Sequence, residues 1–475
     1  MLISDPVSVC VVVSDPGELP TSLDEHLRRG CAVHVLWCAP DAIPTALREA
    51  GVMLSVLDPA DSPDAFRVQN LHEQSRADHA DRVRHTLARL HREHNFDRIE
   101  FGARGGLGLR AIQAKRAGLG FDDVTLAVRL DTCSQWVREQ EQRWPSGFEE
   151  VQIDYLERFA FENADLRLTP DPAVLEFVRR RGWESATQAG RPVPPDDLPP
   201  VTIGIAHFNL GRHLPETLAS LAAQTYPNLE VIVIDDGSTD AHSVAVFEQL
   251  RERYPRFRFL RQPNAGIGAT RNRCLELATG EFFIPVDADN VARPEMVERF
   301  VRAIGRNPHL SAMTCYFLAF EDGAPPGQFL HACRPTGGPH TLACIRNVYG
   351  DANAIFRTAD FREVGGYETD RGTSCEDWEA FVKLVHAGKR IGVVPEHLFD
   401  YRHRPAGFSR ATNWFANHQR VLRQFTRGGH LPAEEAEVLW TALLGFHLRL
   451  EQLEHPPPRL RDRVARGLKR LLAAV

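Results

Sequence analysis

The chain has 475 residues, of which 43% are hydrophobic and 25% charged, and 56 Lys and Arg stand against 63 Asp and Glu. This length predicts two or three domains rather than one core, and the net charge of −7 argues against a nucleic-acid partner. No apolar run approaches the roughly 20 residues of a membrane span. The N-terminus lacks the basic start of a signal peptide, and nine scattered cysteines without a CxxC pair favour reduced thiols in a cytoplasm.

Strand-like and helical stretches alternate through residues 1–188. Apolar runs predict strands at residues 7–13, 31–39, 52–58, 96–102 and 124–131, and a long polar helix is expected at residues 78–94. This alternation predicts an α/β domain with a parallel, doubly wound, Rossmann-like sheet. The glycine-rich run "GARGGLGLRA" lacks a clean GxGxxG register, so a plain strand–helix turn is favoured and a dehydrogenase module is disfavoured.

A seam follows at residues 189–200, "AGRPVPPDDLPP", which hold five prolines and read as a linker. A second α/β unit is predicted over residues 201–410, with helices at residues 215–224, 245–254 and 268–278. From residue 411 to residue 475 the pattern is helical. Its basic, amphipathic end fits a terminal helix packed on the domain, which is favoured, or a helix lying on a membrane surface.

Three successive strands of the second unit end in polar residues. The tips are Asn209, then Asp235 and Asp236, then Asp287 and Asp289. In open α/β sheets, ligands bind outside the carboxyl ends of the strands, so we expect these side chains on one rim. A single acidic tip fits a helix cap or a turn equally well, but three in order favour a ligand site. Two aspartates so close repel each other, and a cation or solvent usually offsets that cost.

Three segments resemble family 2 glycosyltransferases: "VTIGIAHFN" through "DDGSTD", "NAGIGATRN" through "DADN", and "GGYETDRGTSCEDWEAF" through "YRHRPAGFSR". The resemblance covers about residues 200–420. It implies the GT-A fold, a single nucleotide-binding α/β domain. It also implies transfer of a sugar from a nucleotide donor with inversion at the anomeric carbon.

On the donor side, the resemblance places "DAD" at the family's DxD motif. Asp289 would then bind Mg²⁺ or Mn²⁺ together with the donor diphosphate, and Asp287 would contact the ribose or the metal. Asp236, with Asp235 beside it, would read the base. The other donor-side candidates are Ala206, His207, Asn209, Asn264, Gly266, Arg271 and Arg402. His403 would be a further metal ligand or, as is favoured, a solvent-facing residue. The family's "TYN" is "HFN" here, so this segment does not fix the base.

On the acceptor side, a hydroxyl must lose a proton, and a carboxylate within reach can accept it. "CEDWEAF" matches the family's ED motif, which makes Asp377 the expected base and Glu376 its support or an acceptor contact. A capping pair at the start of a helix is the structural alternative and is compatible with that role. Asp351 and Asn353 are expected along the acceptor. Trp378 would line the acceptor site or, as is favoured, pack in the core.

The first 190 residues carry a second resemblance. Residues 96–121 and 154–183, with Trp136, resemble the N-terminal, acceptor-side half of family 4 glycosyltransferases of the GT-B fold. Since the second, donor-binding half of that fold does not follow, this domain would bind acceptor glycan, dock a partner or only stabilise the protein.

The combined prediction is a cytoplasmic, inverting, metal-dependent transferase in cell-surface polysaccharide synthesis, in which the C-terminal helix is the one candidate for peripheral membrane contact. Its donor would be a nucleotide sugar, with UDP the family's commonest nucleotide, and its acceptor a glycan or a lipid-linked molecule. The alternative is a non-catalytic glycan-binding or scaffold protein, against which the intact "DAD" and "ED" motifs speak. The oligomeric state is not indicated.

Overall fold

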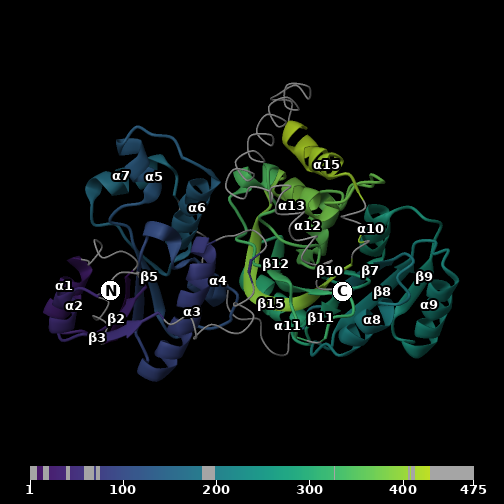
Figure 1. Cartoon of the computed structure of the whole chain (residues 1–475), viewed down its shortest axis with the longest axis horizontal. Helices are drawn as coiled ribbons and strands as arrows, with labels where there is room; N and C mark the ends of the chain where they lie inside the picture. Colours follow the sequence, from purple (N-terminus) through teal and green to yellow (C-terminus); the bar gives the residue numbers. More distant parts are fainter. Residues whose placement is uncertain are drawn as a thin grey trace, which may run out of the picture.

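The computed structural model describes residues 8–13, 21–38, 43–57, 69–70, 75–183, 198–325, 327–404, 407 and 412–427. These residues form two α/β units, each built on its own sheet (Figure 1). The sheets fall on either side of the predicted linker, of which residues 189–197 lie outside the described residues.

The first sheet has six strands in the order β3-β2-β1-β4-β5-β6, and every pairing is parallel. Its strands are β1 (Ser8–Val13), β2 (Ala32–Trp37), β3 (Met53–Val56), β4 (Arg98–Gly102), β5 (Thr125–Arg129) and β6 (Leu166–Leu168). Its helices are α1 (Thr21–Arg28), α2 (Thr45–Glu49), α3 (Ser75–His94), α4 (Leu109–Arg116), α5 (Ser134–Gln140), α6 (Phe148–Asn163) and α7 (Pro172–Arg180). The strand order reverses between β1 and β4, as in doubly wound folds, so the predicted Rossmann-like sheet is confirmed.

The glycine-rich run after β4 is a turn leading into α4, as predicted. It contains the 3₁₀ segment η4 (Arg104–Gly106). Gly106 has a φ of 67°, and a Cβ added there would lie 2.4 Å from the Cβ of Leu156. Only glycine therefore lets α6 approach this turn so closely.

The second sheet has nine strands, with β11-β15-β12-β14-β10-β7-β8-β9 in order and β13 paired to β12. The strands are β7 (Val201–His207), β8 (Leu229–Asp235), β9 (Arg258–Arg261), β10 (Phe282–Asp287), β11 (Val291–Ala292), β12 (Ala312–Glu321), β13 (His331–Cys333), β14 (Ile355–Arg357) and β15 (Ile391–His403). The helical segments are α8 (Leu214–Ala222), α9 (Ala241–Arg253), α10 (Ile267–Leu277), α11 (Met296–Arg306), η5 (His340–Cys344), α12 (Thr358–Glu363), α13 (Glu376–His386) and α15 (Trp414–Thr426). The predicted class, a Rossmann-like sheet followed by a second α/β unit, is confirmed.

Helix ends differ from prediction where a cap decides them. α9 starts at Ala241, four residues before the expected start, because the Asp240 side chain accepts a hydrogen bond from the Ser243 backbone N–H at 2.8 Å. The predicted C-terminal helical stretch is confirmed as far as α15. Residues 428–475, with the basic amphipathic segment, lie outside the described residues. No helix in the described ranges is long and apolar enough to cross a membrane.

Candidate active site

The predicted rim of the second sheet is assembled by strand register. β10, β7 and β8 are parallel neighbours. Asp287 pairs with Ala206, and His207 pairs with Asp235, so the three strands end level with one another. Three segments that are distant in sequence therefore deliver their polar tips to one edge.

Each aspartate of the "DAD" motif meets an arginine. Asp287 Oδ1 accepts from Arg271 Nη2 at 2.5 Å, and Asp289 Oδ2 accepts from Arg404 Nε at 2.5 Å. Burial and the nearby charge of Asp287 raise the pKa of Asp289, while Arg404 acts to lower it. The two carboxylates are a hard oxygen donor set of the kind that Mg²⁺ or Mn²⁺ binds together with phosphate oxygens.

Arg271 joins the "DAD" motif to the "ED" motif. Its side chain is buried, and it donates from Nη1 to Glu376 Oε1 at 2.7 Å as well as from Nη2 to Asp287. Its guanidinium carbon lies 5.3 Å from the ring centroid of Tyr367. Burial alone would lower the pKa of Arg271, but the charges of Asp287 and Glu376 outweigh it and raise the pKa well above its usual value. One permanently charged group therefore holds both motifs together.

The expected base lies in the first turn of α13. Cys375, the N-cap residue, has a left-handed φ of 68° and makes no side-chain cap, but Asp377 Oδ1 accepts from the Trp378 backbone N–H at 2.8 Å, so the expected base also satisfies a first-turn donor of this helix. Burial and the charge of Glu376 raise the pKa of Asp377 to about 7, while Arg271 opposes the shift. A carboxylate with this pKa is suited to general base catalysis near neutral pH.

Asp351 belongs to the same neighbourhood. Burial and the charges of Asp287 and Asp377 raise its pKa well above the usual range. Asn353 connects it to the rim, because its Oδ1 accepts from the Asp287 backbone N–H at 3.4 Å and its Nδ2 is buried without a partner. Glu376 Oε2 is another buried atom without a hydrogen-bond partner. Buried polar atoms of this kind are expected to bind water or substrate.

The "DDGS" and "NAG" segments are tied to each other. The buried carboxylate of Asp236 accepts from the backbone N–H groups of Ala265 and Gly266, both at 2.8 Å, and from Gln262 Nε2 at 2.9 Å. Asn264 Nδ2 donates to the Asp236 carbonyl oxygen at 2.9 Å. The predicted nucleotide-side residues Asp236, Asn264 and Gly266 are therefore in contact, and the Asp236 carboxylate lies at the N-terminal end of α10.

Asp235 and Asn209 organise the loop after β8. Asp235 is fully buried and accepts from the Ser238 backbone N–H at 3.1 Å. Asn209 accepts at Oδ1 from the backbone N–H groups of Thr239 and Asp240, at 2.9 and 3.0 Å. The loop after β8 is therefore held by a buried carboxylate, Asp235, and by an exposed amide, Asn209.

His207 is placed differently from the prediction. Its ring is fully buried and stacks on Phe247 of α9 with 5.9 Å between centroids, and neither ring nitrogen has a partner. Burial lowers its pKa to about 4. Successive strand residues face opposite sides of a sheet. The His207 side chain points into the helix layer, which corrects its assignment as a donor contact.

The guanidinium of Arg402, another predicted donor-side residue, has acidic and backbone partners. It donates to Asp322 Oδ1 at 3.1 Å and to the Asp289 carbonyl oxygen at 3.0 Å, and it forms an ion pair with Glu216. Arg404, two residues further along the chain, is the arginine that reaches the Asp289 carboxylate.

Two further predicted residues are Trp378 and His403. Trp378 is buried and donates from Nε1 to the Ala343 carbonyl oxygen at 2.8 Å, so the favoured core placement holds and the acceptor-side one does not. His403 lies with its ring centroid 6.1 Å from that of His331. Within the described ranges, no group of three or more His, Cys, Asp and Glu side chains that could hold a metal ion is present.

Two tyrosines were missed by the sequence analysis. The buried hydroxyl of Tyr367 has no partner, and the residue directly follows the "GG" before the ED loop. Tyr401 is half-buried, with its ring centroid 5.2 Å from that of Phe317. Burial, then the charges of Asp351, Asp287, Asp289 and Asp377, raise the pKa of Tyr401. Its signal in the sequence is its position at the head of "YRHR".

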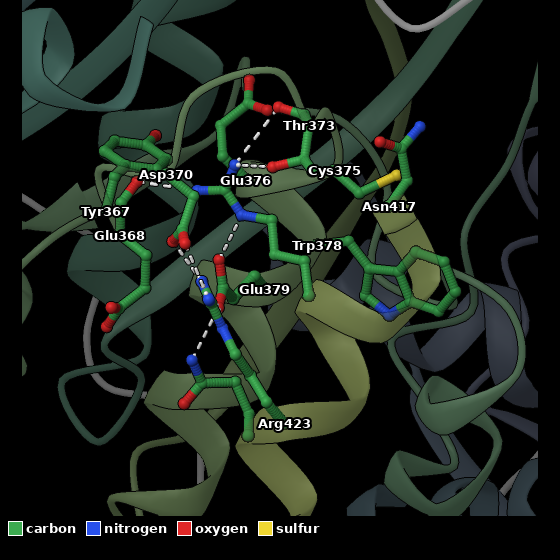
Figure 2. Close-up of polar contacts among 12 residues, drawn as sticks. Tyr367, Glu368, Asp370, Thr373, Cys375, Glu376, Trp378, Glu379, Asn417 and Arg423 are labelled. Atoms are coloured by element: carbon green, nitrogen blue, oxygen red, sulfur yellow. Dashed lines mark hydrogen bonds and ion pairs between the residues drawn. The ribbon is translucent and has the colours of Figure 1, made fainter. Parts of the chain in front are cut away.

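Behind the base, α15 holds the loop that leads into α13 (Figure 2). Glu379 is fully buried in an ion pair with Arg420, and it also accepts from Arg423 Nε at 2.9 Å and Gln424 Nε2 at 2.7 Å. Arg420 reaches the loop itself, donating to the Glu368 carbonyl oxygen at 2.7 Å. The helix that carries the base is therefore fixed from the side away from the rim.

Part of the second unit is similar to a known protein family. Residues 202–365 match the family described as glycosyl transferase family 2. EpsH of Bacillus subtilis (strain 168), named as a glycosyltransferase, is 35% identical over 127 residues, which are 26% of this chain and 36% of EpsH. The chain thus spans little more than a third of this curated relative.

Two solved structures are more distant. The crystal structure of S. aureus TarS 1-349 in complex with UDP-GlcNAc has 19% identity and a TM-score of 0.41, covering 56% of this chain and 77% of that chain. The mannosyltransferase PcManGT from Pyrobaculum calidifontis in complex with GDP-Man and Mn²⁺ has 20% identity and a TM-score of 0.41, covering 64% and 88%. The match to family 2 glycosyltransferases covers residues 202–365 and does not extend to the first unit.

Proposed function

We propose that this chain is an inverting, metal-dependent glycosyltransferase that moves a sugar from a nucleotide donor to a hydroxyl of a glycan or lipid-linked acceptor. The observation that carries the proposal is the double contact of Arg271, which joins Asp287 of the donor motif to Glu376 beside the expected base. A protein that only binds glycan has no need to hold a donor motif and a base motif in one place.

Asp377 is the base. It accepts the proton of the acceptor hydroxyl while that oxygen forms a bond to the anomeric carbon of the donor. The bond from this carbon to the phosphate oxygen breaks, and its electron pair leaves with the nucleoside diphosphate. Attack from the side opposite the leaving group inverts the carbon, and a pKa of about 7 leaves Asp377 ready to accept a proton near neutral pH.

Asp289 and Asp287 would hold the divalent cation, Mg²⁺ or Mn²⁺, because their oxygens suit a hard ion. Such an ion supplies positive charge to the diphosphate as negative charge builds on it. Arg404 and Arg271 are the chain's own cations at this position, and their planar guanidinium groups match phosphate oxygens.

The nucleotide would lie against Ala206, Asn209, Asp236, Asn264 and Gly266, with Asp236 nearest the base. On the strength of the family resemblance we propose UDP as the nucleotide and polysaccharide synthesis at the cytoplasmic face of the membrane as the setting. The first unit, in its resemblance to a family 4 acceptor-side half, would belong to the acceptor side.

Calorimetric titration of UDP, GDP and dTDP, with and without Mn²⁺, tests the proposal on the wild type and on Asp289→Ala. The matched control is Asp360→Ala, which removes a carboxylate of α12 that forms an ion pair of 2.8 Å with Lys389. We expect one nucleotide to bind only with Mn²⁺, and Asp289→Ala alone to lose it. If no nucleotide binds the wild type, the scaffold alternative is favoured instead.

A further inference from the structure

The first unit holds a short stretch of the second unit by its backbone. Arg110 of α4, fully buried, donates from Nη1 to the Pro335 carbonyl oxygen at 3.0 Å and from Nη2 to that of Arg334 at 3.2 Å. Gln113, further along α4, donates from Nε2 to the Thr336 carbonyl oxygen at 3.2 Å. Two side chains of the first unit therefore bind three successive carbonyl groups of the second.

Helix α6 also contacts this stretch, residues 334–338, which we call the clamped segment. Gln152 Nε2 donates to Thr336 Oγ1 at 3.2 Å, and Tyr155 Oη donates to the Thr336 carbonyl oxygen at 3.4 Å. A Cβ added to Gly338 would lie 2.5 Å from Cε2 of Tyr155. The clamped segment is thus bound through its backbone by one helix and packed closely by another.

A buried polar cluster supports the contact between α4 and the clamped segment. Tyr316 of β12 donates to both carboxylate oxygens of Asp81 of α3, at 3.1 and 3.0 Å, and Asp81 lies 3.4 Å from Arg110 Nε. All three side chains are fully buried. Breaking one partner of a buried ionic group is strongly unfavourable, so the first unit is fixed in place at this contact. Figure 1 shows α4 on the side of the first unit that faces β12 and β15.

The other side of the clamped segment touches the acceptor side of the site. The Gly337 backbone N–H donates to the Val348 carbonyl oxygen at 3.0 Å. Gly350 has a φ of 113°, and a Cβ added there would lie 3.2 Å from Cγ of Pro335. The next residue is Asp351, so the clamp ends one residue from a carboxylate of the site.

Asp351 is in turn connected to the reacting groups. Its Oδ1 accepts from the Asn353 backbone N–H at 3.0 Å, and Asn353 Oδ1 accepts from the Asp287 backbone N–H at 3.4 Å. Burial together with the charges of Asp351 and Asp377 raises the pKa of Cys333, the residue before the clamped segment, to about 12. The chain of contacts from α4 therefore ends among the carboxylates of the site.

We infer that the first unit positions the acceptor side of the transfer site, with Arg110 and Gln113 fixing Asp351 through the clamped segment. This inference rests on the proposed function and goes beyond it by giving the first unit a role in the reaction. Arg110 and Gln113 are positioning residues, because they act through the backbone of the second unit and do not touch substrate.

A second contact between the units supplies the control. Arg306 of α11 binds the carboxylate of Asp122 of the first unit through two hydrogen bonds of 3.1 and 2.6 Å, and Asp122 is 54% exposed. If the first unit only stabilises the protein, weakening either contact has the same kind of effect. If the first unit positions Asp351, only weakening the contacts of α4 with the clamped segment should change the mobility of that residue.

The experiment compares the full chain with Gln113→Met and with Asp122→Asn. The Met variant keeps side-chain volume and removes the amide that donates to the Thr336 carbonyl oxygen and accepts from Arg110 Nη1 at 2.8 Å. Hydrogen–deuterium exchange of peptides covering residues 348–353 is the first measurement. We expect Gln113→Met to speed exchange there by about fivefold or more, and Asp122→Asn to leave it unchanged. Equal exchange in all three proteins overturns the inference whether or not activity is found.

The second measurement separates turnover from donor binding, with UDP and Mn²⁺ for binding. Turnover is read from hydrolysis of the most active sugar among UDP-glucose, UDP-galactose and UDP-GlcNAc. We expect Gln113→Met to lower kcat about tenfold with the Kd for UDP within about twofold of wild type. Asp122→Asn should change neither. A wild type that neither binds nor hydrolyses refutes the proposed function, whereas variants that behave alike refute only the positioning role.

Discussion

Both sheets bring polar residues and glycines to the carboxyl ends of their strands, but the two edges differ in how those groups are satisfied. In the first sheet, Glu157 of α6 fills the glycine-rich turn. Its carboxylate accepts from the Gly105 backbone N–H at 2.7 Å and from the backbone N–H and hydroxyl of Ser134 at 2.7 and 2.6 Å. In the second sheet, carboxylates from separate segments face each other, and Asn353 Nδ2 and Tyr367 Oη are buried without partners.

Within a single chain, the two edges thus contrast a turn filled by its own side chain with an edge whose charges are only partly balanced. Backbone N–H groups at a strand–helix turn can bind an anion, but in the first unit a side chain already occupies that place. A cluster of like charges is unfavourable unless something offsets it. In the second unit the arginines Arg271 and Arg404 offset it in part, and a donor with its cation would complete the balance.

The strongest test of the second edge is Asp377→Asn. An amide cannot accept the acceptor's proton, so we expect kcat for transfer to water to fall by roughly 10²- to 10⁴-fold. Because burial raises the pKa of Asp377 to about 7, wild-type turnover should rise as the pH increases through about 7 and the carboxylate loses its proton. The variant should lack this rise. Steady-state hydrolysis of the donor from pH 5.5 to 8.5 measures both effects.

The control for Asp377→Asn is Asp360→Asn, a carboxylate on α12 outside the site. It should keep both the wild-type rate and the wild-type pH dependence, and both variants should bind nucleotide as the wild type does. If Asp377→Asn keeps more than about a tenth of the rate, another carboxylate is the base, and Asp351 would be the next to test.

The support behind the second edge is tested by Arg420→Met. Arg420 and Glu379 are both buried, and among the described residues removing the arginine leaves Glu379 with Arg423 and Gln424 as donors. We expect the free energy of unfolding to fall by about 3 kcal/mol. Urea denaturation monitored by circular dichroism measures it.

Arg423→Met is the matched comparison for that experiment. The Arg423 side chain is 33% exposed and also binds Asp370 on the surface, so its loss should lower the free energy of unfolding by only about 1 kcal/mol. Equal losses of unfolding free energy in the two variants would show that the buried Arg420–Glu379 pair stabilises the loop before Asp377 no more than the half-exposed Arg423 does.

Much of this organisation could be predicted from the sequence because it depends on local patterns. The alternation of strands and helices and the polar tips of β7, β8 and β10 follow from apolar runs ending in Asn or Asp. The face of the sheet to which a side chain points does not follow from these local patterns. "AHFN" carries two neighbouring candidates, Ala206 and His207, and only the packing of α9 against the sheet shows that His207 points inward.

The remaining differences come from partners that are distant in sequence. Arg402 and Arg404 are two residues apart and equivalent by pattern, but Glu216 and Asp322 bind the first and leave the second for Asp289. Glu379 reads as an ordinary polar position of a helix. Its burial depends on α15, whose contact with α13 no local pattern indicates.

The smallest effect is expected in the first edge, from Glu157→Gln. The variant should bind nucleotide and hydrolyse donor like the wild type, since the turn that Glu157 fills lies outside the site.

The free energy of unfolding of Glu157→Gln should be lower than that of the wild type by about 1–2 kcal/mol at pH 5, because an amide cannot accept hydrogen bonds at both ends. Burial raises the pKa of Glu157 from 4.5 to about 7, so between these values the native state binds more protons than the unfolded state. Wild-type stability therefore falls as the pH rises through this window, and the difference from the non-titrating variant should shrink toward pH 7. Urea denaturation at pH 5, 6 and 7 measures this, and a loss of nucleotide binding in Glu157→Gln would show that the two edges are not independent.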